Sequence, residues 1–200
     1  MHNICRAFFG CLIALTIPVA SARATGAASA ASNWGGAVNA ALWDEAAHAA
    51  IRGSSALLTA TPTDIAEFCP AYPSLGANAR EDFWVSLLSR IAAHESGDDP
   101  QRVRWRAYDG AAHRPTFRRG LFQISIESAQ SRAYQCPVAS ADELTNPMAN
   151  IACAAKILDR RVAQANTIAS AGRYWTSMRR HTSRREIAAM TASSMVCARD

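Results

Sequence analysis

Residues 81–96 read EDFWVSLLSRIAAHES, and their apolar side chains recur every three or four positions, which is the spacing of an amphipathic helix. Glu95 lies four residues after Ile91, so its carboxyl group points in the direction of the apolar face. Ser96 and Gly97 follow as a helix end. Burial and the negative end of the helix dipole both favour the protonated form of a carboxyl group, as a general acid requires. Glu95 is therefore a candidate catalytic acid, and a solvated helix end is the alternative interpretation.

Residues 1–24 have the layout of a secretory signal peptide. Arg6 precedes an apolar run that ends at Ala20, and the small residues Ala22 and Ala24 are suitable cleavage positions. The run is too short and too interrupted for a membrane span, and no later segment is long and apolar enough for one. We therefore expect an exported protein, periplasmic or secreted, with no stable membrane insertion after the signal is removed.

The rest of the chain is expected to form one domain preceded by a connector. Residues 25–68 begin with an Ala-, Ser- and Gly-rich lead-in, continue with an Ala-rich helix at about 38–52, and end in a proline-containing connector. Residues 69–200 are expected to be the compact domain. Within it, the polar stretch 98–120 is long enough for a loop or a small hairpin that lines a cleft.

Helix signals dominate the expected domain, and no segment shows the strict alternation of a strand. Asn146 and Pro147 form a helix start, in which an asparagine cap is followed by proline in the first turn. Residues 123–133 are a short helix candidate, and Ser183 and Glu186 have the spacing of a capping box. The domain should therefore be mainly helical.

Four cysteines follow the signal segment: Cys69, Cys136, Cys153 and Cys197. An even number in an exported protein indicates two disulfides, with three connectivities. We pair Cys136 with Cys153, because a short bridge would hold the intervening loop against the next helix. Cys69 and Cys197 would then tie the connector to the C-terminal helix. No metal site is expected, because the sequence has no C-x-x-C and its histidines lack ligand spacing.

Arginine supplies almost all of the positive charge. The formal charge is +5, and it falls to +3 without Arg6 and Arg23. Arginine suits bidentate binding of carboxylates or phosphates. Pairs of arginines are dispersed along the chain, at 118–119, 160–161, 179–180 and 184–185. Their dispersal and the export signal argue against nucleic acid, so an anionic cell-wall polymer is the expected partner and solvated helix faces are the alternative.

Four motifs occur in a characteristic order. They are HESG at 94–97 closing a helix, GLFQIS at 120–125, NPMANI at 146–151 opening a helix, and the aromatic pair Tyr174 and Trp175. This order resembles the soluble lytic transglycosylase (SLT) domain, a lysozyme-like fold of the goose-type group, over about residues 83–180. The resemblance implies a mainly α, lysozyme-like (α+β) single domain with little or no sheet. It also implies that the partner is the glycan strand of peptidoglycan.

The resemblance assigns roles to individual residues. The family's catalytic glutamate and the serine after it match Glu95 and Ser96, and its substrate-contacting glutamine matches Gln123. A tyrosine near the acid matches Tyr174, although the family's Ala-Tyr-Asn-Ala-Gly element is incomplete here. Ser96, Gln123 and Tyr174 are therefore the candidate substrate-binding residues. Their alternatives are a helix-end cap for Ser96, an internal hydrogen-bonding role for Gln123, and core packing for Tyr174.

One glutamate suffices for the reaction that the resemblance implies. A lytic transglycosylase cleaves the β-1,4 bond between N-acetylmuramic acid and N-acetylglucosamine, while the muramic acid 6-hydroxyl attacks its own anomeric carbon. No metal or cofactor is needed. The alternatives are a lysozyme-type hydrolase, which usually requires a second carboxylate, and a catalytically idle peptidoglycan-binding module.

Four nearby carboxylates have no motif and are expected to be surface charges: Asp98, Asp99, Asp109 and Glu127. Three physiological roles are compatible with such a reaction. They are wall turnover, making room for a secretion apparatus whose components are not specified, and attack on a competitor.

Overall fold

The computed structural model describes residues 34–106 and 116–198. The signal peptide expected at residues 1–24 and the carboxylate Asp109 lie outside these ranges. In chain order the elements are α1 (Ala40–Arg52), α2 (Ser55–Thr59), α3 (Ile65–Phe68), η1 (Tyr72–Ser74), α4 (Ala77–Ser96), β1 (Val103–Arg106), β2 (Thr116–Arg119), β3 (Ile124–Ser125), α5 (Ile126–Ala129), η2 (Asp142–Thr145), α6 (Pro147–Ala165), η3 (Ala169–Arg173), α7 (Thr176–Arg179) and α8 (His181–Ala192). The predicted mainly helical, lysozyme-like fold is confirmed.

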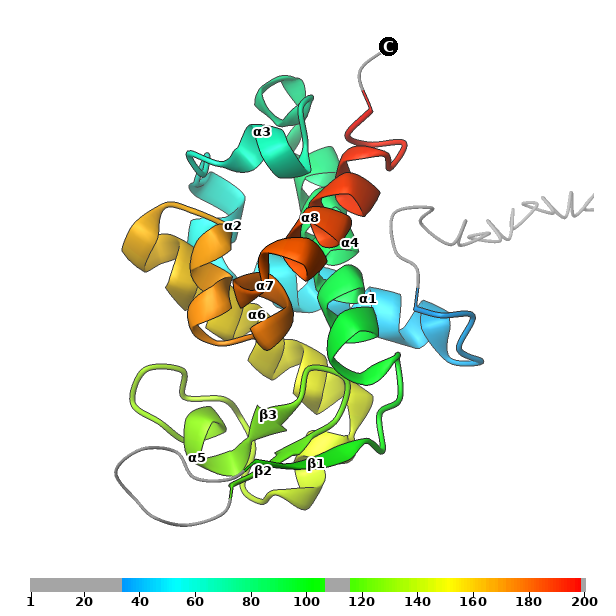
Figure 1. The fold of residues 1–200 in the computed structure, drawn as a ribbon, viewed down its shortest axis with the longest axis vertical. Coiled ribbons are helices and arrows are strands. Elements are labelled where there is room, and N and C mark those ends of the chain that lie inside the picture. Colours follow the sequence, from blue (N-terminus) through cyan, green and yellow to red (C-terminus); the bar gives the residue numbers. More distant parts are fainter. Residues whose placement is uncertain (1–33, 107–115, 199–200) are drawn as a thin grey trace, which may run out of the picture.

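Helix α4 runs through the middle of the helical body (Figure 1) and packs against α1, α2, α7 and α8. Residues 83–89 are all buried, including two serines, so this part of the helix is covered on every side rather than along one stripe. The helix begins at Ala77, four residues before the predicted start. Because α4 is held by four neighbours, its C-terminal end, which carries Glu95, has a fixed position.

The small sheet lies at the lower end of the helical body in Figure 1. Its three strands pair antiparallel in the order β1-β2-β3, with Trp105 opposite Phe117 and Arg118 opposite Ser125. The hairpin of β1 and β2 falls in the stretch 98–120, where a loop or small hairpin was expected. The strands are too short to show a recognisable alternation in the sequence.

Two predicted helix boundaries are wrong. The helix expected at 123–133 is reduced to α5, because Gln123 adopts φ 49° and the next two residues pair with β2. Helix α8 already begins at His181, so Ser183 lies inside it and does not cap it. In the first case, pairing with β2 overrides the local helix signal.

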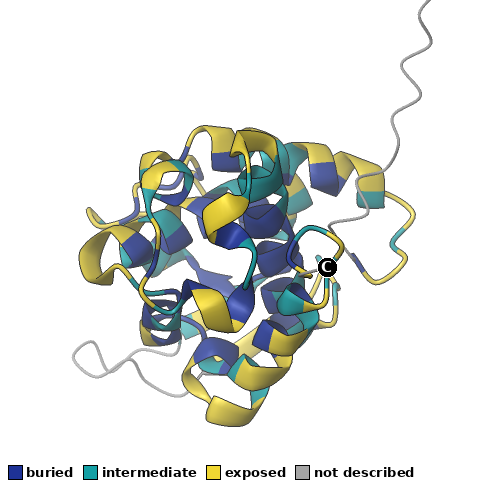
Figure 2. Cartoon of the chain, turned by 90° about the horizontal axis from the view of Figure 1, so that it is seen from above, coloured by how far each residue is buried: buried dark blue, intermediate teal, exposed yellow. Residues whose placement is uncertain are grey.

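Residues 34–68 contribute to the same core as the rest of the protein, whereas the sequence suggested a lead-in and connector. Trp34 is 2% exposed and packs edge-to-face on Trp43, with ring centroids 5.9 Å apart. Helix α1 lies against α4 and α6. A boundary at residue 69 therefore falls inside the hydrophobic core. The Ala-rich segment before it contributes a few large buried side chains to that core. Figure 2 shows buried residues where the helices face one another and exposed residues on their outer turns.

Two disulfides join distant parts of the chain, Cys69 to Cys197 and Cys136 to Cys153, with Cα atoms 4.7 and 5.0 Å apart. This is the pairing expected from the sequence. The second bridge holds the segment after α5 against α6.

None of the helices in the described ranges is both long and apolar enough to cross a bilayer.

Candidate active site

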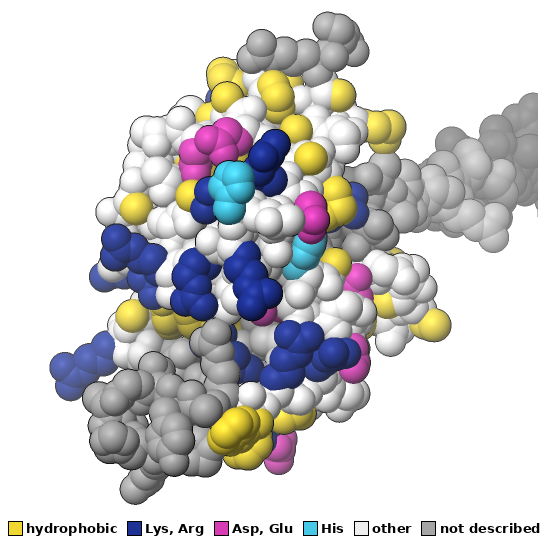
Figure 3. Space-filling model, viewed as in Figure 1, with side chains coloured by type: hydrophobic (Ala, Val, Ile, Leu, Met, Phe, Trp, Pro, Cys, Tyr) yellow, Lys and Arg dark blue, Asp and Glu magenta, His cyan; other side chains and the backbone are white. Residues whose placement is uncertain are grey.

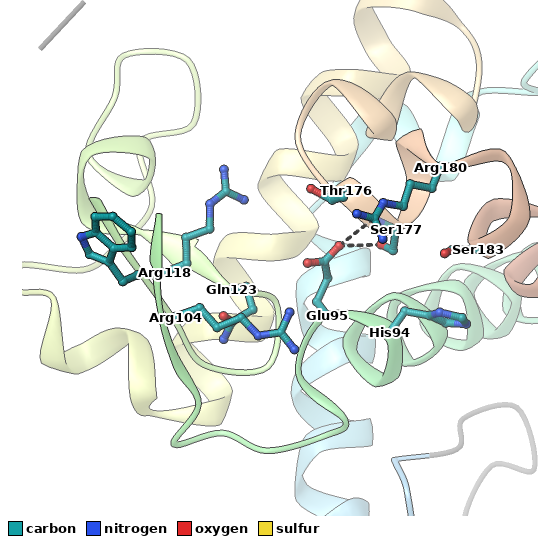
Figure 4. A pocket seen from close by; sticks show the side chains of 10 residues that line it. His94, Glu95, Arg104, Arg118, Gln123, Thr176, Ser177, Arg180 and Ser183 are labelled. Atoms are coloured by element: carbon teal, nitrogen blue, oxygen red, sulfur yellow. Dashed lines mark hydrogen bonds between the residues drawn. The ribbon is translucent and has the colours of Figure 1, made fainter. Parts of the chain in front are cut away.

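Glu95 is only 7% exposed, at the C-terminal end of α4, so this helix end is not solvated. The helix stops at Gly97, whose φ of 70° is readily adopted by glycine. Glu95 Oε1 accepts hydrogen bonds from the backbone N–H of Ser177 at 3.0 Å and from Ser177 Oγ at 2.6 Å. Within the described part of the chain, Oε2 has no hydrogen-bond partner. In Figure 4 the carboxyl group lies between Ser177 and the side chains of Arg118 and Gln123.

A pocket of about 280 Å³ opens beside this carboxyl group. Its lining comes from α4 (His94, Glu95), the sheet region (Arg104, Trp105, Arg118, Gln123) and the α7–α8 segment (Thr176, Ser177, Arg180, Ser183). The sheet and the helices therefore form different walls of the pocket, with Glu95 between them (Figure 4). Among these lining residues Glu95 is the one carboxylate, and three are arginines.

The GLFQIS motif forms a tight turn that brings Gln123 to the pocket. Gly120 has φ 76°, and a Cβ there would lie 2.2 Å from the carbonyl oxygen of Leu144, so only glycine fits. Gln123 is 1% exposed, and its Nε2 donates to the carbonyl oxygens of Arg102 at 3.0 Å and Gly120 at 2.9 Å. Its Oε1 is buried without a partner in the described ranges. The amide therefore holds the turn through its nitrogen and leaves its oxygen as an acceptor.

The NPMANI motif supports this turn from α6. Asn146 caps the helix as predicted, accepting two backbone N–H bonds at 3.0 and 3.3 Å. Asn150 is fully buried, and its Oδ1 accepts the N–H of Phe122 at 2.8 Å. Its Nδ2 donates to the carbonyl oxygens of Leu144 at 2.8 Å and Arg119 at 3.2 Å. Asn150 is thus the link between two motifs that are separate in the sequence.

Ser96 and Tyr174 are not brought to the Glu95 pocket. Ser96 is 1% exposed and donates to the carbonyl oxygen of Ala92 at 3.1 Å within its own helix. Tyr174 packs edge-to-face on Trp175 at 5.1 Å and on Tyr134 at 5.7 Å. Burial raises the pKa of the Tyr174 hydroxyl above the ordinary value for tyrosine. The structure therefore places Ser96 in a helix-end role and Tyr174 in a packed aromatic cluster.

Sequence reasoning missed Ser177, the residue that holds Glu95. It follows the aromatic pair, and Trp175 donates its indole N–H to the carbonyl oxygen of Phe122 at 3.0 Å, which fixes α7 beside the turn. No motif marks a serine at this position, so its role follows only from the contact across 82 residues.

Two arginines of the pocket, Arg104 and Arg118, are directly opposite each other in the hairpin of β1 and β2. Such a pairing of like charges is normally unfavourable.

No group of three or more His, Cys, Asp or Glu side chains within residues 34–106 and 116–198 could hold a metal ion. The residues present instead offer one buried carboxyl group, hydrogen-bond groups and guanidinium groups around an open pocket. Such a set can transfer a proton and bind a polar, anionic or sugar-containing ligand.

A helical body, a small antiparallel sheet and a buried glutamate between them define the class as a lysozyme-like domain. The chain belongs to the transglycosylase SLT domain family, whose family model matches residues 73–191. Members of this family act on peptidoglycan.

Among solved structures the chain is similar to the wild-type form of Bd0314 DslA, with 28% identity and a TM-score of 0.74. That match covers 82% of this chain and 94% of the other. A DslA variant with glutamine in place of one glutamate is 27% identical, again with a TM-score of 0.74, over 82% of this chain and 95% of the other. The comparison with curated proteins gave no match.

Proposed function

We propose that the protein is an exported lytic transglycosylase that cleaves the bond between N-acetylmuramic acid and N-acetylglucosamine, with Glu95 as acid and then base. The observation that carries the proposal is the state of the Glu95 carboxyl group. It is buried at the pocket, held through Oε1 by Ser177, and without a hydrogen-bond partner at Oε2 among the residues that the structure describes. Family membership supports peptidoglycan as the substrate, and two disulfides favour an oxidising, extracytoplasmic location.

The proposed reaction proceeds in two proton transfers. Glu95 donates its proton from Oε2 to the leaving O4 of N-acetylglucosamine as the bond from the muramic acid C1 to O4 breaks. The carboxylate then accepts the proton of the muramic acid 6-hydroxyl while O6 bonds to C1. The proton is back on Glu95, no water is consumed, and the product is a 1,6-anhydro sugar.

Ser177 and Gln123 support these steps in different ways. The two hydrogen bonds from Ser177 orient the Glu95 carboxyl group and stabilise its anion between the proton transfers. Gln123 Oε1, a buried acceptor without a partner in the described ranges, suits an N–H or hydroxyl group of the sugar.

The lining of the pocket favours transglycosylation over hydrolysis. Most glycosidases use two carboxyl groups, the second as nucleophile or as the base that activates water. Glu95 is the one carboxylate among the described residues that line this pocket. Attack by the substrate's own hydroxyl requires no second carboxylate, which agrees with that lining.

Digestion of purified peptidoglycan, followed by mass spectrometry of the soluble products, tests the proposal. We expect 1,6-anhydro ends from the wild-type protein and a loss of activity of about 10²- to 10⁴-fold in Glu95→Gln, which keeps the shape but cannot donate a proton. Circular dichroism checks that the variant is folded.

Products heavier by one water would identify a hydrolase instead. Wild-type rates in folded Glu95→Gln would remove Glu95 from the mechanism. Binding without cleavage by the wild-type protein would identify an idle binding module.

A further inference from the structure

A second pocket, of about 420 Å³, adjoins the Glu95 pocket and is rich in arginine. We call it the arginine groove and define it by Arg118, Arg161, Arg173 and Arg179. Arg118 lines both pockets, so the groove lies next to the site around Glu95. Figure 3 shows Lys and Arg side chains gathered across the middle of the face in view.

Aromatic rings hold two of these arginines in place. The Cζ atom of Arg118 lies 5.5 Å from the centre of the Tyr174 ring, and that of Arg161 lies 5.5 Å from the centre of the Tyr134 ring. Arg161 Nη2 also donates to the Tyr134 hydroxyl, and the two tyrosine rings are themselves in contact. Side chains that are already ordered lose less entropy when a ligand binds.

In the part of the chain that the structure describes, the arginines of the groove outnumber its carboxylates. None of its four arginines forms an ion pair with a carboxylate in the described ranges, and Glu127 is the one carboxylate in the lining. The Nε atom of Arg161 is buried without a hydrogen-bond partner there. Guanidinium groups in such a setting suit the carboxylates or phosphates of a ligand.

We infer that the arginine groove binds the carboxylates of the peptide stem carried by the muramic acid that Glu95 acts on. The inference rests on the proposed function. Because the groove and the Glu95 pocket are neighbours that share Arg118, one extended substrate molecule can reach both. In peptidoglycan the stem is amide-linked to the lactyl group of muramic acid, which makes that carboxyl group neutral. The free carboxylates lie further along the peptide, away from the bond that is cleaved. The groove likewise lies to one side of Glu95, where these carboxylates can reach it.

The test compares identical glycan strands with their peptide stems and after an amidase has removed the stems. We expect the wild-type protein to have a higher kcat/KM for the peptide-bearing strands. In the double variant Arg173→Gln, Arg179→Gln this preference should fall by about tenfold or more, mainly through KM, because charge-assisted hydrogen bonds remote from the reacting bond are lost.

The matched control is Arg160→Gln, Arg185→Gln, which removes the same charge from two exposed positions outside the groove. Its preference for peptide-bearing strands should equal that of the wild-type protein. Equal kcat/KM of the wild-type protein for both strands, or an unchanged preference in Arg173→Gln, Arg179→Gln, overturns the inference and leaves the proposed function standing. A preference for stem-free strands overturns it as well, because the lactyl carboxylate would then be the ligand.

If neither kind of strand is cleaved, the proposed function fails and calorimetry with a soluble stem tetrapeptide decides the inference. Saturable binding that is weakened in Arg173→Gln, Arg179→Gln, but not in the control, supports the groove as a peptide site. No binding to the wild-type protein overturns it.

Discussion

At the scale of single residues, Glu95 depends on a partner that the local sequence does not supply. Its own helix provides burial, but the hydrogen bonds to Oε1 come from Ser177 on α7. The backbone N–H at position 177 would orient the carboxyl group with any residue other than proline there. The hydroxyl group adds a second, shorter bond, and it is the part of the interaction that a substitution can remove.

Ser177→Ala should therefore lower kcat for peptidoglycan cleavage by about ten- to a hundredfold while changing KM little. The reason is the loss of one hydrogen bond to a charged group, worth about 1.5–3 kcal/mol. Steady-state kinetics measures the effect. The control is Ser193→Ala, which changes an exposed serine at the end of α8. An unchanged kcat in Ser177→Ala would show that the backbone N–H alone positions Glu95.

Asp98, three residues after Glu95, should make stability depend on pH. Burial raises its pKa to about 6 from 3.8, against the opposing effect of Arg90. A carboxyl group whose pKa is higher in the folded state stabilises the protein fully below about pH 4, and this contribution is lost as the pH rises through 6. Urea unfolding at pH 4 to 7.5 should show Asp98→Asn gaining stability relative to the wild-type protein as the pH rises. A difference that stays constant with pH would contradict the assignment.

At the scale of elements, the turn at 120–125 and the start of α6 form one unit. Asn150 joins them, because its side chain satisfies the N–H of Phe122 and the carbonyl oxygens of Leu144 and Arg119. The sequence shows the two motifs as separate stretches. Their contact explains why Gln123 is held at the pocket.

Asn150→Ala should destabilise the fold by about 2–4 kcal/mol, because it leaves buried polar groups of the backbone unsatisfied. Urea unfolding measures the loss, and Asn78→Ala at an exposed position of α4 serves as the control with little expected effect. If both variants unfold at the same urea concentration as the wild-type protein, Asn150 does not support the turn.

At the scale of the whole molecule, the two disulfides close loops of very different length. Cys69 and Cys197 are 128 residues apart, whereas Cys136 and Cys153 are 17 apart. In the chain-entropy model the longer loop contributes about 5 kcal/mol and the shorter about 3 kcal/mol. Replacing the first pair by serine should therefore cost more stability in urea unfolding than replacing the second. The reverse order would show that the short bridge stabilises chiefly through the packing around Tyr134 and α6.

Much of the fold could be predicted from the sequence, because it is encoded by residues that are near one another. The apolar periodicity of 81–96 predicted α4 and the burial of Glu95, and Asn146 with Pro147 marked the start of α6. Even the cysteine pairing followed from which helices the loops connect. Helix periodicity and caps involve neighbours within about four residues, so they can be recognised without a tertiary structure.

The composition of the site was decided only by the tertiary structure. Ser177 reaches Glu95 across 82 residues, and the arginine groove combines side chains from β2, α6, η3 and α7. Tyr174 and Trp175 are neighbours in the sequence, yet Trp175 fixes the turn while Tyr174 turns toward the groove. Such groupings depend on how the helices pack around α4 and where the sheet meets them. The distances between these side chains cannot be deduced from their spacing along the chain.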